Sequence, residues 1–282
     1  MRSIDFLDIP KYSDWPAILL GLKGFSQKKK TPSEVMREFD LEKWSSVLSM
    51  LESDVSMRAS DIDSSRLGKI EIPIMDSGRF YLTSGLEALQ AQLDHQIRVM
   101  ARWGQNASAL AELGAGYGSI LFRLARTQEF RRHRFFAAEY TRSGQAAIDI
   151  LAPREGLAIP TGYCDFREMR SEGAMPPLDS IIYTSYAVHY VDELSADFTG
   201  FFASMKPSVV VHFEPCYEHC DSTTVYGMMC KRYIEINDYN RNLASVLWRS
   251  RDRGTIEILL EEKQVVGANP FLPMSIFVWR PK

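Results

Sequence analysis

Apolar residues recur at helical spacing through the first hundred residues of the chain. Two stretches show this spacing: residues 84–102 and the four positions Trp44, Val47, Leu48 and Leu51. A period of three to four residues places such side chains on one face, so both stretches are predicted to form amphipathic helices. Another helix is predicted to begin at Thr31, because Thr31, Pro32 and Glu34 have the form of an N-cap, a first-turn proline and an acidic third position.

Beyond residue 106 the pattern changes to short apolar runs that alternate with helical segments. Strands are predicted over residues 109–113, 134–139, 157–163, 179–185, 208–213, 255–266 and 274–279. Helices are predicted over residues 119–127, 143–151, 192–205 and 223–248. Repeated strand–helix pairs predict a mostly parallel sheet with helices on both faces, and the turn-forming residues between the last two strands predict an antiparallel hairpin.

The change of pattern divides the chain into two expected parts. The polar stretch Gly104-Gln105-Asn106 is the expected boundary. We therefore predict an α/β fold in which residues 1–106 form a helical N-terminal cap, with a short β-segment near residues 70–80, and residues 107–282 form the sheet domain.

Composition narrows the classes of protein to consider. Of 282 residues, 45% are hydrophobic and 24% charged, which suits one large domain or a domain with a cap. The net charge of −3 and the shortness of the basic runs 28–30 and 131–134, both interpreted as solvated, argue against nucleic-acid binding. Apolar runs too short to span a bilayer, and first residues without a signal-peptide core, predict a cytoplasmic protein without membrane contact.

Four cysteines offer little support for a metal site. In a chain of this kind they are expected to be free thiols. Cys216, His219 and Cys220 lie close together in sequence. A structural zinc site needs four ligands, usually in two separated pairs, and no second pair is evident. We therefore expect no metal.

The strongest candidate for chemistry is the glycine-rich loop Glu112-Leu113-Gly114-Ala115-Gly116-Tyr117-Gly118, between a predicted strand and a predicted helix. Glycine permits positive φ and lets a ligand approach the backbone, and the following helix start presents free N–H groups. The loop departs from the dinucleotide-binding pattern, because Ser119 stands where that pattern has a helix-packing glycine. Its place between strand and helix is what favours a ligand site.

Two acidic residues follow the next two predicted strands. Glu139, with Tyr140 after it, ends the second strand, and a carboxylate ~20 residues beyond such a loop can accept hydrogen bonds from ribose hydroxyls. Asp165 follows the third strand and is placed to take the exocyclic amine of adenine, with Phe166 beside the ring. The alternative for Asp165 is a helix N-cap.

With these residues in these places, residues 107–282 resemble the class I S-adenosylmethionine (SAM) dependent methyltransferase family. The resemblance rests on the glycine-rich loop, the two acidic residues, the segment 184–190 and the terminal hairpin. It implies a Rossmann-like seven-stranded sheet ending in an antiparallel strand, with SAM as the cofactor. The residues that it implies for SAM binding are Glu112, Gly114, Ala115, Gly116, Glu139, Tyr140, Asp165, Phe166, Thr184 and Ser185. By similarity, the glycines approach the amino-acid part, and Thr184 and Ser185 lie under the methionine portion.

Three further residues are candidates for the transfer step: His189, Glu214 and Glu218. Methyl transfer depends on in-line positioning and desolvation, and an oxygen acceptor also needs a base, for which His189 is the candidate. Glu214 and Glu218 follow the fifth strand, at the edge where α/β proteins bind ligands, and two carboxylates can hold a cationic acceptor. Aromatic walls for it are expected from Tyr186, Tyr190 and Tyr217. The alternatives are a packed histidine, a loop glutamate and a glutamate that stabilises a helix start.

These expectations combine into a SAM-dependent methyltransferase acting on a small molecule, with an amine or guanidino nitrogen favoured as acceptor. Three alternatives stay open: O-methylation with His189 as base, a non-catalytic SAM-fold subunit that binds a partner protein, and an NAD or nucleotide-sugar enzyme on a similar sheet. The expected partner is a small-molecule acceptor, and monomer and homodimer both remain open.

Overall fold

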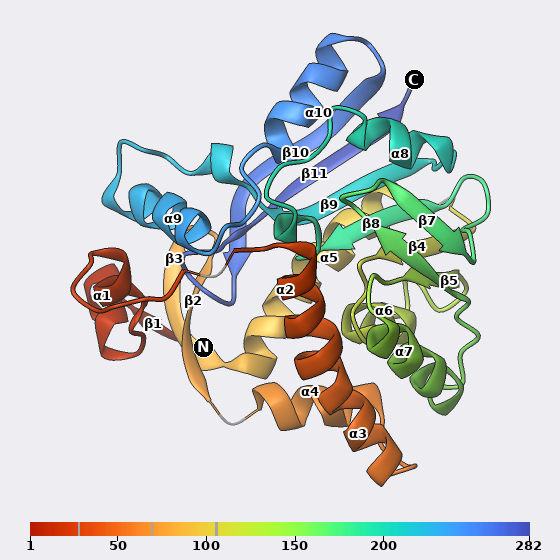
Figure 1. The fold of residues 1–282 in the computed structure, drawn as a ribbon, viewed down its shortest axis with the longest axis horizontal. Coiled ribbons are helices and arrows are strands. Elements are labelled where there is room, and N and C mark those ends of the chain that lie inside the picture. Colours follow the sequence, from red (N-terminus) through yellow and green to blue (C-terminus); the bar gives the residue numbers. More distant parts are fainter. Residues whose placement is uncertain (28, 69, 105–106) are drawn as a thin grey trace.

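The computed structural model describes residues 1–27, 29–68, 70–104 and 107–282, and their strands form one sheet (Figure 1). The strands are β1 (Arg2–Ile4), β2 (Glu71–Asp76), β3 (Arg79–Ser84), β4 (Ala109–Leu113), β5 (Arg134–Ala138), β6 (Thr161–Asp165), β7 (Arg170–Gly173), β8 (Ile181–Ser185), β9 (Val209–Pro215), β10 (Ile256–Gly267) and β11 (Met274–Pro281). Their order across the sheet is β1-β3-β2-β10-β11-β9-β8-β4-β5-β6-β7.

Helices cover both faces of this sheet. The α-helices are α1 (Trp15–Leu19), α2 (Pro32–Met36), α3 (Ser45–Ser53), α4 (Ala59–Leu67), α5 (Gly85–Trp103), α6 (Ser119–Arg126), α7 (Arg142–Arg154), α8 (Phe198–Ser204), α9 (Val225–Ile236) and α10 (Leu243–Asp252). A π-helical stretch, η2 (Arg37–Trp44), joins α2 to α3. The short 3₁₀ turns are η1 (Phe6–Lys11), η3 (Val188–Tyr190) and η4 (Tyr217–His219).

The predicted count of seven strands is wrong, since the described residues form eleven. The seven predicted strands are present as β4, β5, β6, β8, β9, β10 and β11. The others extend the sheet at its two edges: β7 pairs with β6, and β2 pairs with β10 through Asp76 opposite Val266. The N-terminal region is therefore not only helical, because β1, β2 and β3 belong to the main sheet.

The middle of the sheet is parallel and contains a reversal of strand order. β4 pairs in parallel with β5 on one side and with β8 on the other. The chain runs from β4 outward to β5 and β6, and then returns to β8 and β9 on the opposite side. Such a reversal leaves a crevice at the carboxyl ends of the two central strands, where ligands bind in α/β proteins. β11 lies antiparallel between β9 and β10.

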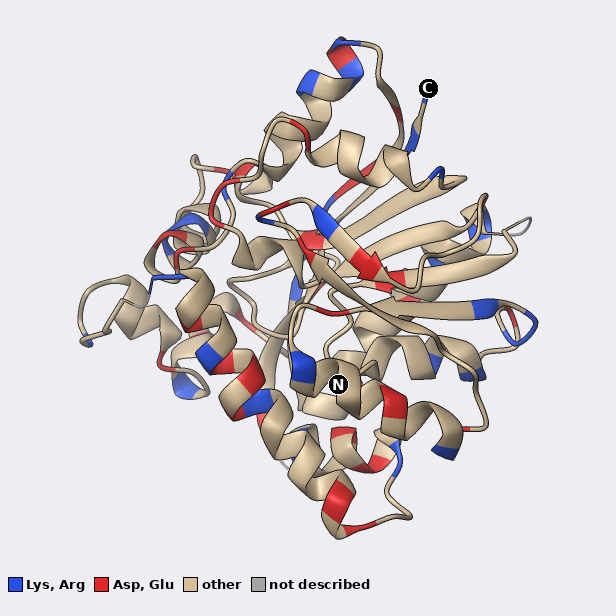
Figure 2. Cartoon of the chain, turned by 45° about the vertical axis from the view of Figure 1, so that its right-hand side comes forward, with Lys and Arg blue, Asp and Glu red and all other residues tan. Residues whose placement is uncertain are grey.

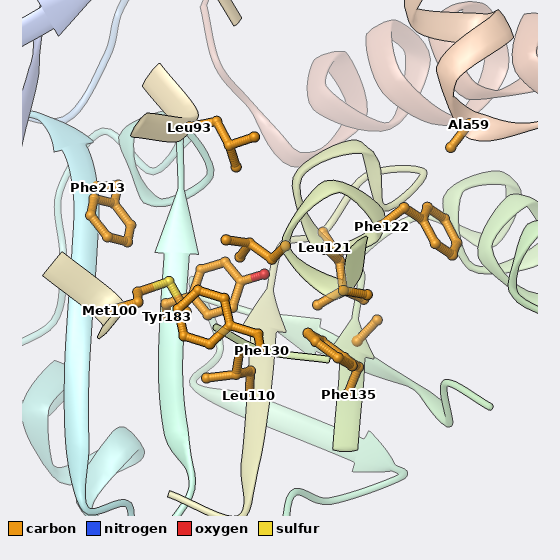
Figure 3. Packing of buried hydrophobic residues seen from close by; sticks show 14 of the residues in the cluster. Ala59, Leu93, Met100, Leu110, Leu121, Phe122, Phe130, Phe135, Tyr183 and Phe213 are labelled. Atoms are coloured by element: carbon orange, nitrogen blue, oxygen red, sulfur yellow. The ribbon is translucent and has the colours of Figure 1, made fainter. Parts of the chain in front are cut away.

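Alternate side chains of the central strands fill two separate apolar layers. Leu110 and Tyr183 point to the face covered by α5, α6 and α7, whereas their neighbours Ala111 and Ile182 pack under α8 and α10. This follows from the two-residue period of a strand. Figure 3 shows the first layer, in which Leu93 and Met100 of α5 lie over the strands.

The N-terminal helices begin where their sequence predicts. The side chain of Thr31 accepts a hydrogen bond from the N–H of Glu34 (3.3 Å), with Pro32 in the first turn, as predicted. α5 also matches its predicted span. The predicted domain boundary falls on residues 104–106, of which 105 and 106 lie outside the described residues.

The long helix predicted over residues 223–248 is wrong, because the chain turns between α9 and α10. Asp238 has a φ of 54°, which no helix interior contains. Asn240 is buried there and its side-chain amide donates to the carbonyl of Val191 (2.8 Å). Its side-chain oxygen accepts the N–H of Asn242 (3.1 Å), which is the kind of local hydrogen bond by which asparagine competes with a helix.

Charged residues of both signs are mixed over the fold (Figure 2), and the cysteines form no disulfide bonds. In the view of Figure 2, basic and acidic segments are interspersed. No helix among the described residues is long and apolar enough to cross a membrane. The four cysteines are buried and unpaired, and the described residues contain no group of three His, Cys, Asp or Glu side chains arranged to bind a metal.

Candidate active site

The loop between β4 and α6 turns tightly because its glycines adopt positive φ, with 78° at Gly114, 59° at Gly116 and 84° at Gly118. A Cβ atom at Gly114 would lie 2.4 Å from the Cβ of Ala187, in the segment after β8. A Cβ atom at Gly116 would lie 2.9 Å from Cζ2 of Trp44. Close approach by two other segments therefore requires glycine at both positions.

Glu139 holds this loop from the tip of β5. Its carboxylate accepts hydrogen bonds from the N–H of Gly116 (2.8 Å) and from the N–H and hydroxyl of Thr141 (3.0 and 2.8 Å). Burial raises the pKa of Glu139 above its ordinary value, although these donors act to lower it. A carboxylate has about four lone-pair positions, so these three donors leave it able to accept a hydrogen bond from a ligand hydroxyl.

Glu112 lies at the end of β4, next to the same loop. Its side chain is 2% exposed and accepts a hydrogen bond from the hydroxyl of Tyr183 (3.1 Å). Burial raises the pKa of Glu112 to about 8, so the carboxyl is protonated at neutral pH. A ligand cation placed beside it would favour the ionised form.

Asp165 and Phe166 follow β6 on the far side of the loop. Oδ1 of Asp165 accepts the N–H groups of Arg167 (2.8 Å) and Glu168 (3.3 Å) in the turn that leads to β7. No helix begins in this described segment, so Asp165 is not the helix N-cap that was its alternative role. The side chain nevertheless lies on a cavity wall, as do Phe166 and Tyr140.

These residues surround one cavity of about 370 Å³ at the carboxyl edge of the sheet. Small-molecule sites have volumes of about 300–1,000 Å³. The structure brings nine of the ten predicted SAM-binding residues to its walls: Glu112, Gly114, Ala115, Gly116, Glu139, Tyr140, Asp165, Phe166 and Ser185. They come from the ends of β4, β5, β6 and β8, so the cavity occupies the crevice where the strand order reverses.

Thr184 is the exception and does not line the cavity. It is fully buried within β8, and its hydroxyl lies 3.0 Å from Nδ1 of His212. Side chains alternate along a strand, so Ser185 faces the opposite side and reaches the cavity. There its hydroxyl accepts a hydrogen bond from the buried amide of Gln96 on α5 (2.9 Å), a contact that the sequence did not predict.

His189 and Glu214 lie together, although not as the sequence predicted. The carboxylate of Glu214 is fully buried and accepts the N–H groups of Ala187 (2.9 Å) and Val188 (3.0 Å), while its Oε2 lies 3.3 Å from Nδ1 of His189. Burial acts to raise the pKa of Glu214, but the hydrogen bonds from His189 and the backbone outweigh it and lower that pKa. Glu214 thus braces the segment after β8 and is not on the cavity wall.

The partner of this carboxylate is a neutral histidine. Burial lowers the pKa of His189 below its ordinary value, more than Glu214 raises it. A neutral imidazole that donates from Nδ1 to Glu214 presents Nε2 as a hydrogen-bond acceptor. The ring packs between aromatic residues, with centroids 4.0 Å from Tyr190 and 4.7 Å from Tyr239.

Glu218 lies away from the cavity and holds the start of α10. Its carboxylate accepts the N–H of Ser245 (2.9 Å) and the thiol of Cys216 (3.3 Å). The predicted pair of carboxylates for a cationic acceptor is therefore not formed, because Glu214 is enclosed and Glu218 points to a helix end.

The N-terminal region supplies a wall that sequence reasoning did not assign residue by residue. Side chains from α2, η2 and α4 line the cavity: Val35, Phe39, Lys43, Trp44 and Arg66. The positions on α2 and η2 recur every four or five residues, so one face of this helical stretch covers the glycine-rich loop. The guanidinium of Arg66 lies over the indole of Trp44 (5.3 Å).

A buried acid on α4 ties this region to the loop. Asp63 is fully buried and accepts hydrogen bonds from the hydroxyls of Tyr117 and Ser119 (2.8 Å for the latter) and from Nε of Arg123 (2.9 Å). A buried carboxylate with this many donors fixes the positions of all of them. Its location on an N-terminal helix explains why the spacing of the loop residues alone did not reveal it.

Comparison with known proteins gives similarity in structure only. No family model and no curated protein matches the sequence. Among solved structures, magnesium protoporphyrin IX methyltransferase from Synechocystis, with bound SAH, is 11% identical with a TM-score of 0.48, over 70% of this chain and 84% of that one. A SAM-dependent methyltransferase from Clostridium acetobutylicum is 8% identical with a TM-score of 0.48, over 67% and 90% of the two chains. The plantazolicin methyltransferase BpumL, solved with SAH, is 7% identical with a TM-score of 0.45, over 68% and 83%.

All three of these structures are methyltransferases. Identities this low, with TM-scores below 0.5, carry no argument about activity. The residues that line the cavity are therefore the evidence for function.

Proposed function

We propose that this chain is a SAM-dependent methyltransferase acting on a small molecule. The observation that carries the proposal is the set of groups around the cavity at the reversal of strand order. A glycine-rich loop, a buried carboxylate at the tip of β5 and an Asp–Phe pair after β6 line the same space. These are the groups that an amino acid, a ribose and an adenine would each need.

The residues present fit SAM group by group. Glu139 accepts the ribose hydroxyls, Asp165 takes the exocyclic amine of adenine, and Phe166 lies along the ring. Glu112 pairs with the ammonium of the amino-acid part, and the loop at Gly114 and Gly116 approaches its backbone. When bound, SAM supplies an electrophilic methyl group on a sulfonium.

His189 is the proposed base for the acceptor. It is held by Glu214 through Nδ1, its ring packs against Tyr190 of the cavity wall, and its lowered pKa keeps it neutral at pH 7. Glu214 is a positioning residue in this account, since it acts through His189 and the backbone of residues 187–189 and does not bind the acceptor. The same base serves an oxygen acceptor or an ammonium that must lose a proton, so both classes remain candidates.

Coverage of the cavity supports a small acceptor. Phe39 and Trp44 of η2 and Tyr190 of η3 lie on its walls, and such a cover excludes water from a methyl-transfer site.

We also propose that the protein acts in the cytoplasm, as its sequence predicts.

Calorimetric titration tests the proposal. We expect S-adenosylhomocysteine to bind one-to-one and NAD not to bind. Glu139→Gln should weaken that binding about tenfold, because a hydrogen bond to a charged group is worth about 1.5–3 kcal/mol. The matched control is Glu168→Gln, an acid close by in sequence whose side chain is 63% exposed; it should leave the affinity unchanged. Equal affinity in wild type and Glu139→Gln, or tight NAD binding, would remove the assignment.

A further inference from the structure

A buried lysine contradicts the prediction that the first basic run is solvated. Lys29 is exposed, Lys28 lies outside the described residues, and Lys30 is only 7% exposed. Burying a lysine is costly unless its ammonium is paired, so its surroundings show what the site recognises.

The ammonium of Lys30 lies in a site built for a cation. Nζ lies 2.6 Å from Oε2 of Glu38, 5.2 Å from the ring centroid of Tyr190 and 5.5 Å from that of Tyr239. The two tyrosine rings are 5.4 Å apart and nearly perpendicular, at 87°. Two ring faces and a carboxylate are the elements of an aromatic site for an ammonium group.

This site adjoins the proposed transfer centre. Tyr190 lines the cavity, and its ring, like that of Tyr239, packs against His189. The positive charge of Lys30 is close enough to His189 to contribute to its lowered pKa. Tyr190 therefore connects the cation site and the candidate base to the cavity wall.

The ammonium is not needed to hold its own segment in place. The N–H of Lys30 donates to Asp238 (3.1 Å) and its carbonyl accepts from the guanidinium of Arg167, so the main chain is fixed on both sides. A lysine side chain has a flexible four-carbon stem, which can leave the site while the main chain stays.

We propose that Glu38, Tyr190 and Tyr239 bind the ammonium group of the methyl acceptor, and that Lys30 occupies this site until the acceptor displaces it. The acceptor is then a primary or secondary alkylamine. This inference rests on the proposed methyltransferase function and names its substrate class. Exchange of one ammonium for another leaves the charge of the site unchanged, since Glu38 also keeps its ion pair with Lys43 (2.7 Å).

The chemistry balances with the groups named. The bound ammonium gives one proton to Nε2 of His189, which frees the nitrogen lone pair. That lone pair forms the N–CH₃ bond as the C–S bond breaks, and the bonding electrons return to sulfur to give a neutral thioether. The products are an N-methylated ammonium and S-adenosylhomocysteine, and His189 releases its proton to solvent.

Chemical rescue tests the inference. Lys30→Ala leaves the site empty, and n-propylammonium, which matches the three carbons and the ammonium that the substitution removes, should bind it about tenfold or more tighter than it binds wild type. Lys29→Ala is the matched control and should behave as wild type. Lys30→Ala combined with Glu38→Gln should lose the gain. Thermal melts check the fold; if Lys30→Ala does not fold, Lys30→Met with methylammonium replaces it, because the methionine keeps most of the apolar stem.

The decisive readout is methylation of n-propylamine by Lys30→Ala in the presence of SAM, measured by mass spectrometry alongside SAM affinity. Binding with formation of N-methylpropylamine is the expected result. Absence of amine binding overturns the cation site, and binding without methylation while SAM still binds overturns its role as the acceptor site. Failure to bind SAM overturns the proposed function, and this inference with it.

Discussion

We expect Glu112 to make the affinity for SAM depend on pH. The burial of its carboxyl determines whether that affinity rises or falls with pH. The pKa of the free carboxyl is about 8, raised by burial, and an ammonium beside it would lower that pKa. Binding below pH 8 therefore releases a proton, so the affinity rises toward pH 8, by up to about tenfold per unit. Above that pH the rise ends, because the α-amino group of the ligand itself titrates at about 7.7–8.0.

Glu112→Gln should remove this rise while keeping an oxygen for the hydroxyl of Tyr183. Calorimetry from pH 6 to pH 8 measures it. The same slope in the variant and in wild type would show that Glu112 does not face the ammonium.

Asp63 should matter for cofactor binding although it does not touch the cavity. Asp63→Asn turns one acceptor oxygen into a donor and leaves a hydroxyl or guanidinium donor of the loop region without its partner, at a cost of about 1–3 kcal/mol. We expect a lower melting temperature and a weaker affinity for S-adenosylhomocysteine, with Ser65→Ala on the exposed side of the same helix as control. Loss of stability with unchanged affinity would limit Asp63 to a structural role.

The predicted SAM-binding residues that line the cavity are those at or next to strand ends. Glu139, Asp165 and the glycines reach one cavity because the carboxyl ends of parallel strands meet at one edge. Glu214 lies near the end of β9, but nothing in the sequence shows that three backbone N–H groups and a histidine would enclose it. Asp63 and Lys30 were missed because the partners of Asp63 and the aromatic partners of Lys30 lie far away along the chain.

The helical stretch α2-η2-α3 is the element that closes the cavity. Its covering face is fixed by Asp40, which accepts hydrogen bonds from the N–H (2.8 Å) and hydroxyl (2.7 Å) of Ser143 at the start of α7. π-Helical segments are rare and occur frequently at functional sites. The sequence predicted two helices here but not this geometry, because the register of backbone hydrogen bonds depends on packing against the loop.

We expect the stretch α2-η2-α3 to retain the bound cofactor mainly through the side chain of Trp44. Its indole lies over Gly116 and packs on Tyr117 at 5.3 Å. Trp44→Ala should raise the dissociation rate of S-adenosylhomocysteine about tenfold or more, since a cover of this size is worth more than 1.4 kcal/mol. Surface plasmon resonance measures the rate. Leu41→Ala, on the same stretch but 68% exposed, is the control, and an equal rate in both variants would contradict a covering role for η2.

We propose that the chain folds as one unit, without the division that the sequence predicts at residue 106. Val47 and Leu51 from the N-terminal region belong to the same apolar cluster as Leu110 and Phe122 of the sheet domain. Figure 3 shows Leu93 and Met100, also from the N-terminal region, in this cluster. The sheet continues through β10 into β2. Sequence patterns revealed the change of element type near residue 106 but not this shared core, because the contacts join positions far apart in sequence.

A fragment of residues 107–282 should therefore not fold alone. Removing α5 uncovers a face of the central strands, and removing β2 exposes an edge of β10. We expect circular dichroism without a cooperative melt for the fragment, and one transition for the full chain. A fragment that melts cooperatively and binds S-adenosylhomocysteine would show two independent domains.

A co-crystal structure with S-adenosylhomocysteine tests the central claim most directly. The account predicts the adenosyl group in the cavity beneath Trp44, with its ribose on Glu139, its adenine between Asp165 and Phe166, and its amino-acid part beside Glu112. Ligand density at another place, or a cavity closed by the protein itself at saturating ligand, would contradict it.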